Sequence, residues 1–325
     1  MEILVTGGAG YIGSHMVTSL VDSGYKVVTL DNLYSGFRDA VIAGEFVEGD
    51  LSDRRLLEQL FSGHSFAGVM HFAAHIEVGE SVRNPAKYYR NNFTNAQNLL
   101  DVMVAHGVNR FIFSSTAAIF GEPSYVPIDE RHQKNPINPY GRSKRMVEQL
   151  LEDYDRAYGL RSIALRYFNA AGADPLTRLG ERHDPETHLI PLVLQAASGR
   201  REHISIFGSD YDTADGTCIR DYIHVVDLCQ AHLLALQALL EGKGSNRYNL
   251  GNGQGYSVRE VIDTAEKVTQ TKIPVIRSER REGDPARLVA DSRRARSELG
   301  WKPRYGNLET IIAHAWQWEQ KMPSK

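Results

Sequence analysis

The chain has 325 residues, of which 42% are hydrophobic, and its 37 basic and 40 acidic side chains give a net charge of −3. This near balance argues against a polybasic nucleic-acid binder and against an adaptor for anionic membranes. Cys218 and Cys229 are too few for a disulfide framework. No apolar run approaches the roughly 20 residues of a membrane helix, and no basic stretch marks a signal peptide. We therefore expect a soluble, cytoplasmic protein with one large domain or two smaller ones.

Strand patterns alternate with longer helical patterns through the first half of the chain. Buried strands are predicted at residues 2–6, 26–30, 45–48, 68–73, 110–115 and 161–167. Helices are predicted between them, most clearly at residues 52–62, 85–106 and 138–158. Alternation of this kind requires right-handed crossovers, so it predicts an α/β fold with a doubly wound parallel sheet.

The pattern changes after Asn169. Residues 172–185 are rich in glycine, proline and charge, and shorter mixed elements follow. We therefore expect one domain over residues 1–170 and a smaller mixed α/β lobe over residues 171–325. Within that lobe, the segment at about 220–240 is a candidate to return to the first domain.

A glycine-rich turn, TGGAGYIG at residues 6–13, joins the first strand to the first helix. Glycines here let the backbone approach a pyrophosphate, which then lies on the helix N-terminus. Glycines also serve simple tight turns, but Asp31 ends the second strand about 20 residues later. A carboxylate there suits the ribose hydroxyls of NAD and would repel the 2′-phosphate of NADP. Asp50, after the third strand, is placed either to reach the adenine or to cap the next helix.

Tyr140 and Lys144 are spaced to lie on one face of a predicted helix. This spacing is common, and alone it would indicate an exposed tyrosine and a solvated lysine. However, the preceding strand ends in hydroxyl side chains, Ser114 to Thr116, where the carboxyl edge of a parallel sheet holds its ligand. An ammonium one turn away, together with a cationic nicotinamide ring, would stabilise a tyrosine phenolate.

In this order, these motifs resemble those of the extended short-chain dehydrogenase/reductase superfamily. Further segments are similar to its nucleotide-sugar 4-epimerases, such as the UDP-galactose (UDP-glucose) 4-epimerases. They are His71-Phe72-Ala73-Ala74, Val78-Gly79-Glu80-Ser81, Tyr88-Tyr89-Arg90-Asn91-Asn92, Arg166-Tyr167-Phe168-Asn169, RDYIHV at 220–225, YNLG at 248–251 and RREGD at 280–284. The resemblance runs from residue 1 to about 318. It implies a Rossmann-type NAD-binding domain followed by a lobe that mainly holds a UDP-sugar.

The resemblance also implies roles for individual residues. Tyr140 would be the base at the sugar 4′-hydroxyl, Lys144 would tune it and hold the nicotinamide ribose, and Thr116 would bind the 4′-oxygen. Because epimerisation is redox-neutral, NAD would stay bound. The implied NAD contacts are Gly7, Gly10, Tyr11, Ile12, Gly13, Asp31, Asn32, Asp50, Leu51, Phe72, Ala73, Ala74, Asn91, Ser114, Tyr140, Lys144, Tyr167 and Phe168.

Arginine suits bidentate contact with the diphosphate of such a substrate. The resemblance implies that the UDP-sugar contacts are Thr116, Tyr140, Asn169, His188, Leu189, Phe207, Arg220, Arg281, Asp284 and Leu288. Without the resemblance, the basic segment 277–287 would fit a solvated charged face equally well. We expect no metal site, because His71 and His75 straddle a strand end and no third ligand is evident.

The sequence also bears on the choice of reaction and of sugar. No acidic residue stands two positions after Thr116, which disfavours a dehydratase or a decarboxylase, since both need a base at C5. Ile76 and Phe120 replace residues common in relatives. Leu288 is intermediate in size at a position that varies with the sugar, so UDP-glucose, UDP-N-acetylglucosamine and UDP-xylose/UDP-arabinose all stay open.

Two rival functions share the same motifs. A net NAD-dependent dehydrogenase would use the same residues, and a non-catalytic NAD-binding regulator would share the fold without needing the tyrosine, lysine and threonine. By the same resemblance, helices at 93–103 and 146–154 would pack between subunits. We therefore expect a homodimer that binds neither nucleic acid nor membrane.

Overall fold

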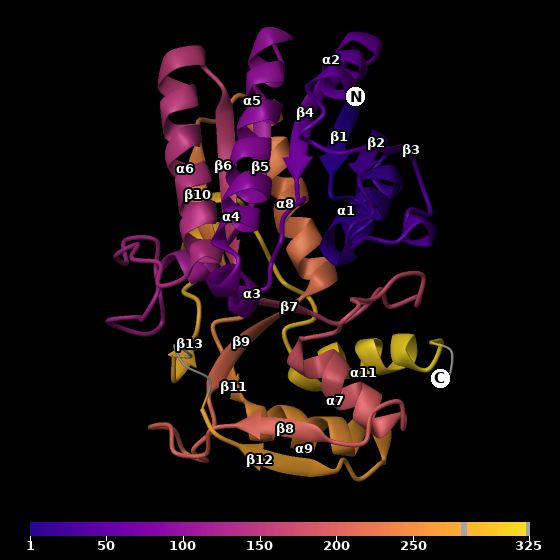
Figure 1. Ribbon diagram of the computed structural model, residues 1–325, viewed down its shortest axis with the longest axis vertical. Helices are drawn as coiled ribbons and strands as arrows, with labels where there is room; N and C mark the ends of the chain where they lie inside the picture. The colour runs from indigo at the N-terminus through magenta and orange to yellow at the C-terminus, as the bar shows by residue number, and fades with distance from the viewer. Residues whose placement is uncertain (281–284, 323–325) are drawn as a thin grey trace.

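The computed structural model describes residues 1–280 and 285–322 and has two lobes (Figure 1). The larger lobe contains a seven-stranded sheet in which every pairing is parallel. The strands run in the order β10 (Asn246–Leu250), β6 (Arg161–Tyr167), β5 (Arg110–Thr116), β4 (Phe66–His71), β1 (Glu2–Thr6), β2 (Lys26–Asp31), β3 (Glu45–Glu48). The strand order reverses between β1 and β4, as in Rossmann folds, so the predicted doubly wound sheet is confirmed.

Helices cover both faces of this sheet. One face packs against α1 (Tyr11–Asp22), α8 (Val225–Leu240) and the short α10 (Arg293–Glu298). The other packs against α2 (Arg54–Gly63), α5 (Asn95–Ala105) and α6 (Pro139–Tyr158). The predicted helix at 85–106 forms as α4 (Pro85–Tyr88), a π-helical turn (Tyr89–Thr94) and α5, and α3 (Val78–Arg83) precedes it. No helix among the described residues is both long and apolar enough to cross a bilayer.

The smaller lobe has its own apolar core, built by three helices and short sheets (Figure 1). The helices are α7 (Leu189–Ala197), α9 (Val258–Thr269) and α11 (Leu308–Glu319). Strand β8 (Ile204–Phe207) pairs with β12 (Val275–Ser278), and β9 (Ile219–His224) pairs with β7 (Asn169–Ala171), β11 (Gly255–Ser257) and β13 (Arg287–Leu288). Three segments from this half of the chain, α8, β10 and α10, lie in the larger lobe.

The fourth strand begins and ends two residues before its predicted bounds. It covers residues 66–71 rather than 68–73, because Phe72 and Ala73 leave the sheet ladder. Their N–H groups both donate to the carbonyl of Thr6, at 2.8 and 3.1 Å. This turns the chain across the glycine-rich turn, where a Cβ on Gly7 would lie 2.4 Å from the nitrogen of Ala73.

The glycine-rich turn requires the absence of side chains. Gly7 has a φ of +75°, and a Cβ on Gly13 would lie 2.0 Å from the carbonyl oxygen of Gly7. The N-cap of α1 is Gly10, whose lack of a side chain leaves the first N–H groups of the helix without a side-chain cap. The turn therefore presents free backbone donors to whatever lies over it.

A buried ion pair attaches α6 to the sheet. The guanidinium of Arg166 in β6 donates to both carboxylate oxygens of Glu148 in α6, at 2.8 and 2.6 Å. The hydroxyl of Ser115, the register partner of Arg166 in β5, donates to the same carboxylate at 2.7 Å. Glu148 and Arg166 are each 1% exposed, so neither charge is solvated by water. The network sets the position of α6 relative to β5 and β6.

We expect Gly13→Ala to reduce the free energy of unfolding by about 1–3 kcal/mol, because the added methyl meets a rigid backbone carbonyl. The matched control is Gly63→Ala at the exposed end of α2, where a Cβ meets nothing within 4 Å. Alanine is the better helix former, so the control should be neutral or slightly stabilising. Urea unfolding of both variants measures the difference, and equal stabilities would contradict the packing argument.

We expect Glu148→Ala to cost about 3–5 kcal/mol, because it leaves the Arg166 charge buried and unpaired. Replacing both partners, as Glu148→Leu with Arg166→Met, should recover much of that loss. Chemical denaturation measures both, with Glu58→Ala as the control, since that side chain is 41% exposed. A double variant no more stable than Glu148→Ala would show that the loss does not come from the unpaired charge.

Candidate active site

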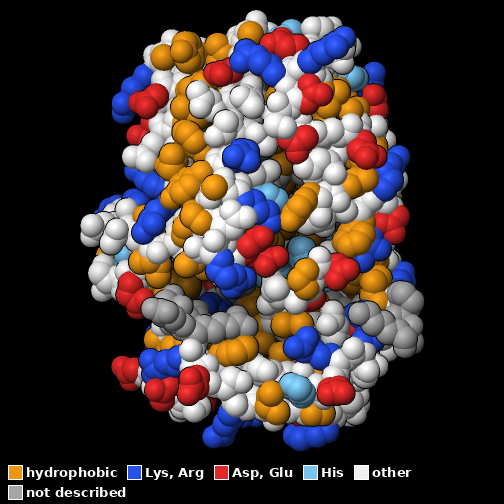
Figure 2. All heavy atoms as spheres, viewed as in Figure 1, with side chains coloured by type: hydrophobic (Ala, Val, Ile, Leu, Met, Phe, Trp, Pro, Cys, Tyr) orange, Lys and Arg blue, Asp and Glu red, His pale blue; other side chains and the backbone are white. Residues whose placement is uncertain are grey.

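The main cavity lies between the two lobes, at the carboxyl ends of the central strands, and the surface is hollowed there (Figure 2). Every residue predicted to contact NAD lines this cavity, and so do several of the predicted substrate contacts. The lining includes Gly7, Gly10, Tyr11, Ile12, Gly13, Asp31, Asn32, Asp50, Leu51, Phe72, Ala73, Ala74, Asn91, Ser114, Thr116, Tyr140, Lys144, Tyr167, Phe168, Asn169, His188, Arg220 and Leu288. Motifs from distant parts of the chain thus share one wall.

Some predicted substrate residues are not part of this wall. Leu189 begins α7 and packs against the core of the smaller lobe. Phe207 ends β8 and is likewise not among the residues that line the cavity. Arg281 and Asp284 lie outside the described residues, so their contacts with substrate stay predictions.

The Tyr140 and Lys144 pair forms as the spacing predicts. The side chain of Asn138 caps α6 by accepting from the N–H of Gly141 at 2.9 Å, which places Tyr140 in the first turn. Lys144 lies one turn further along and donates to the carbonyl of Ser114 in β5 at 2.9 Å. The tyrosine and the lysine therefore both face the end of β5.

In the absence of a bound ligand, burial is the largest influence on the pKa values of Tyr140 and Lys144. It lowers the pKa of Lys144 to about 7. It raises the pKa of Tyr140, while a hydrogen bond with the hydroxyl of Thr116 acts in the opposite direction. The expected phenolate is therefore not favoured by the chain alone. A neighbouring positive charge would have to overcome the desolvation of Tyr140.

The acidic end of the cavity matches a ribose site. The carboxylate of Asp31, at the end of β2, accepts from the N–H groups of Ala9 at 2.9 Å and Leu33 at 2.8 Å. Burial raises the pKa of Asp31, and these two donors oppose the rise. The backbone bonds hold the carboxylate beside the glycine-rich turn.

Asp50 lies beside the same end of the cavity and accepts from the side chain of Asn32 at 2.5 Å. The alternative role of Asp50 as a helix cap is wrong. The N-cap of α2 is Asp53, whose side chain accepts from the N–H of Leu56 at 3.0 Å. The adenine contact of Asp50 stays a prediction.

Other cavity residues were not predicted from the sequence. Tyr34 and Ser35 line the cavity because Leu33, with a φ of 57°, turns the chain back past Asp31. Asp31 and Asn32 at the end of β2 are typical turn residues, and they could have predicted that the chain reverses here. Glu181 and His183 also line the cavity, although their segment reads only as a charged loop.

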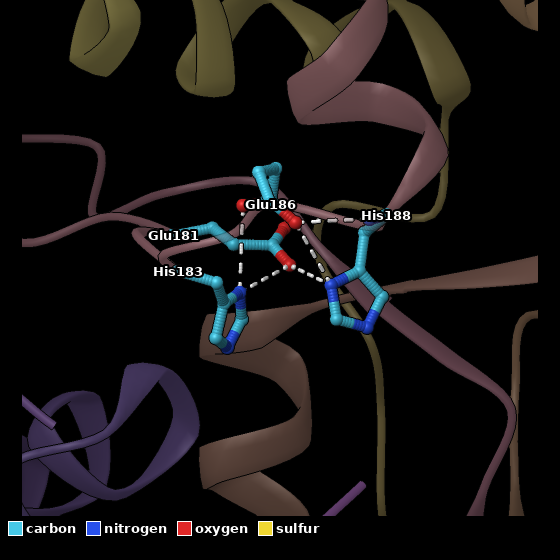
Figure 3. Close-up of side chains that lie close together, drawn as sticks. All are labelled: Glu181, His183, Glu186 and His188. Atoms are coloured by element: carbon cyan, nitrogen blue, oxygen red, sulfur yellow. Dashed lines mark hydrogen bonds and ion pairs between the residues drawn. The ribbon is translucent and has the colours of Figure 1, made fainter. Parts of the chain in front are cut away.

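His188 lines the cavity and lies beside two carboxylates, those of Glu181 and Glu186. Burial alone would lower its pKa, but the charges of Glu181 and Glu186 raise the pKa of His188 to about 10. Its Nδ1 lies 3.0 Å from Glu181 and 3.1 Å from Glu186, while Nε2 points away from them (Figure 3). A substrate would therefore meet the Nε2 side of the ring.

Comparisons with known proteins agree with this geometry. Residues 3–251 match the family model for the NAD dependent epimerase/dehydratase family. The UDP-glucose 4-epimerase of Halalkalibacterium halodurans is 51% identical over 323 residues, covering 99% of this chain and 97% of the relative.

Solved structures of the same family share this fold over nearly the whole chain. The UDP-glucose 4-epimerase from Brucella ovis in complex with NAD has a TM-score of 0.95 and 50% identity and covers 97% of each chain. The enzyme from Bifidobacterium longum in complex with NAD⁺ and UDP has a TM-score of 0.94 at 38% identity, covering 100% of this chain and 99% of that one. The UDP-Glc/GlcNAc 4-epimerase from Campylobacter jejuni reaches 0.86 at 45% identity, covering 99% of both. The chain therefore belongs to the NAD dependent epimerase/dehydratase family and, within it, to the UDP-glucose 4-epimerases.

Proposed function

We propose that the chain is an NAD-dependent isomerase that interconverts UDP-glucose and UDP-galactose by inverting C4′. The observation that carries the proposal is the joint position of Tyr140, Lys144 and Thr116 at the end of β5, in the cavity lined by all the predicted NAD contacts. The names of the relatives support the same activity. A non-catalytic NAD-binding protein would have no use for this arrangement.

NAD, held by the glycine-rich turn, Asp31 and Lys144, would supply reversible hydride transfer at C4′, which allows inversion through a 4-keto sugar. Tyr140 accepts the proton of the 4′-hydroxyl at its phenol oxygen and returns it in the second half. Thr116 holds the 4′-oxygen through its hydroxyl. Lys144, anchored on the Ser114 carbonyl, adds positive charge near the tyrosine when protonated, and its pKa of about 7 leaves both protonation states accessible.

The diphosphate and the sugar would contact the wall on the side of the smaller lobe. Arg220 and Asn169 lie there, on adjacent strands β9 and β7. One terminal guanidinium nitrogen of Arg220 donates to the carbonyls of Ile219 and Pro285, at 2.8 and 2.9 Å. These two bonds orient the guanidinium group. Leu288 lines the cavity, packs against the cluster around Phe120 and takes up more room than a small residue at this position would. This favours a simple hexose over an N-acetylhexosamine.

We also propose that the chain assembles as a homodimer in the cytoplasm. Helices α5 and α6 pack side by side on one face of the larger lobe (Figure 1), with Phe93 and Leu150 only partly buried against the core. A second copy would complete the burial of these side chains. The two cysteines are buried and form no disulfide, which suits a reducing compartment.

The activity is tested by incubating the purified protein, with no NAD added, with UDP-galactose, UDP-N-acetylgalactosamine and UDP-arabinose in separate tubes. We expect NMR to show UDP-glucose from UDP-galactose, with the other two converted more slowly. Absence of any 4-epimer, with and without supplied NAD, would contradict the epimerase. Stoichiometric release of NADH would instead favour a net dehydrogenase.

Tyr140→Phe should lower kcat by about 100-fold or more while UDP binding changes little, because only the proton transfer is removed. Tyr158→Phe is the matched control, on the same helix but 60% exposed, and should keep full activity. Turnover by NMR and UDP binding by calorimetry separate the two effects. Retained activity in Tyr140→Phe would show that another group is the base.

For the dimer, we expect light scattering coupled to size-exclusion chromatography to report twice the mass of one chain. Leu150→Lys should shift the mass towards that of one chain, because a charge would enter the apolar contact. A wild-type protein that elutes only as a monomer at micromolar concentration would contradict the assembly.

A further inference from the structure

The loop between β7 and α7 brings together four side chains that the epimerase reaction does not require as a group. Glu181, His183, Glu186 and His188 converge from this loop on one point, with both carboxylates facing both imidazoles (Figure 3). One potential ligand atom from each lies within 4.8 Å of all the others. Among the described residues, this is the one group of three or more His, Cys, Asp or Glu side chains with such spacing.

Four nitrogen–oxygen separations in the cluster are comparable with the edge of a coordination tetrahedron. Four ligands at about 2.0–2.1 Å from a zinc ion lie about 3.3 Å from one another. Here, Nδ1 of His183 lies 3.5 Å from Glu181 and 3.4 Å from Glu186. Nδ1 of His188 lies 3.0 and 3.1 Å from the same two carboxylates. These four separations are comparable with a tetrahedral edge, although the two histidines face different oxygens of Glu186. A set of four ligand atoms, one from each residue, lies within 4.8 Å, so a modest inward movement would complete the tetrahedron.

Ordinary hydrogen bonding does not account for His183. Its Nδ1 is buried and makes no hydrogen bond, and its two carboxylate separations exceed the usual 2.7–3.2 Å of a charge-assisted bond. A buried ring nitrogen that faces two carboxylates only at ion-pair distance, without a well-formed hydrogen bond to either, is costly. An ion between them would bind that nitrogen.

The charge of the cluster also calls for a cation. The side chains of Glu181 and Glu186 are only 6% and 5% exposed, and their ion pairs among the described residues are with these two histidines. Both arginines within the loop are directed elsewhere. Arg182 pairs with Asp39 and stacks on Phe37, and Arg178 pairs with Asp22 and Asp174. The two buried carboxylates carry more negative charge than a single protonated imidazole at His188 offsets, and a divalent ion that displaces this proton would neutralise both carboxylates.

We propose that Glu181, His183, Glu186 and His188 bind one divalent transition-metal ion, best matched by Zn²⁺, through two imidazole nitrogens and two carboxylate oxygens. Imidazole ligands disfavour Mg²⁺ and Ca²⁺, which take six or more oxygen ligands. Lack of a thiolate disfavours Cu(I). The four protein ligands close the coordination sphere, so the site is structural.

The position of the site indicates what the ion would stabilise. The ring of Tyr11, from the glycine-rich turn, packs edge-on against His183 at 6.3 Å, and its hydroxyl donates to the carbonyl of Gly172 at the start of the loop. His188 is the N-cap residue of α7. The ion would therefore stabilise the loop between β7 and α7, which contacts the glycine-rich turn through Tyr11. Nε2 of His188 would still face the cavity.

The test uses the full chain, purified without a metal-affinity tag, stripped with EDTA, dialysed, loaded with ZnCl₂ and freed of excess metal. We expect one zinc per chain by plasma mass spectrometry. His183→Ala and Glu186→Gln should each raise the zinc Kd by about 100-fold or more. The matched control is His64→Ala, because His64 also faces two carboxylates, Glu2 at 3.4 Å and Glu45 at 3.9 Å, and it should bind as the wild type does.

Co²⁺ in place of zinc supplies a readout that does not depend on the variants. Visible d–d absorption of the intensity typical of four-coordinate Co²⁺, without a thiolate charge-transfer band, is the expected spectrum. Failure of the wild type to retain zinc, a six-coordinate cobalt spectrum, or equal zinc retention in His183→Ala and Glu186→Gln would each overturn the proposal. Because these are binding measurements, they stand or fall separately from the epimerase assay.

Discussion

The seating of α6 on the sheet is the constraint on which the active site depends. Tyr140 and Lys144 reach the end of β5 only if this helix keeps its depth and rotation. Two contacts fix both: Lys144 donates to the Ser114 carbonyl at 2.9 Å, and one turn later Glu148 joins Arg166 and Ser115. A buried ion pair adds little net stability compared with apolar packing, but it tolerates little displacement. The protein thus uses a buried ion pair to position the helix that carries the proposed catalytic side chains.

The backbone at the glycine-rich turn supplies a second constraint, of opposite character. There the chain approaches itself so closely that Gly13 meets the Gly7 carbonyl and Ala73 meets Gly7. This contact explains why β4 ends at residue 71, and it brings the Phe72 to Ala74 segment to the wall of the cavity. Close backbone packing positions the part of the cavity wall around Gly7 and Ala73. The Glu148–Arg166–Ser115 network positions the part around Tyr140 and Lys144.

The smaller lobe approaches this rigid wall through the loop at residues 172–188. Tyr11, from the glycine-rich turn, donates to the carbonyl of Gly172 at the start of this loop, and the loop ends at His188, the N-cap residue of α7. The net charge of −3 is compatible with an anionic substrate, because a few arginines such as Arg220 act locally rather than through a global field. The same loop concentrates two buried carboxylates and two imidazoles, and a metal ion there would link cofactor-side and substrate-side elements.

The sequence by itself determined the features that depend on local spacing. Strand and helix periods placed the parallel sheet, the glycines placed the turn, and the i,i+4 spacing placed Tyr140 beside Lys144 on one face of α6. The family resemblance indicated the residues expected to contact NAD, and all of them line one cavity. Those that follow a strand, such as Phe72, meet there because parallel strands end at one edge of the sheet. Only the tertiary structure decided that Glu148 pairs with Arg166, that Leu189 and Phe207 do not line the cavity, and that Glu181 and His183 join His188. These outcomes depend on which buried charges pair and on where segments distant in the sequence pack. Such long-range contacts produce no periodic pattern in the sequence.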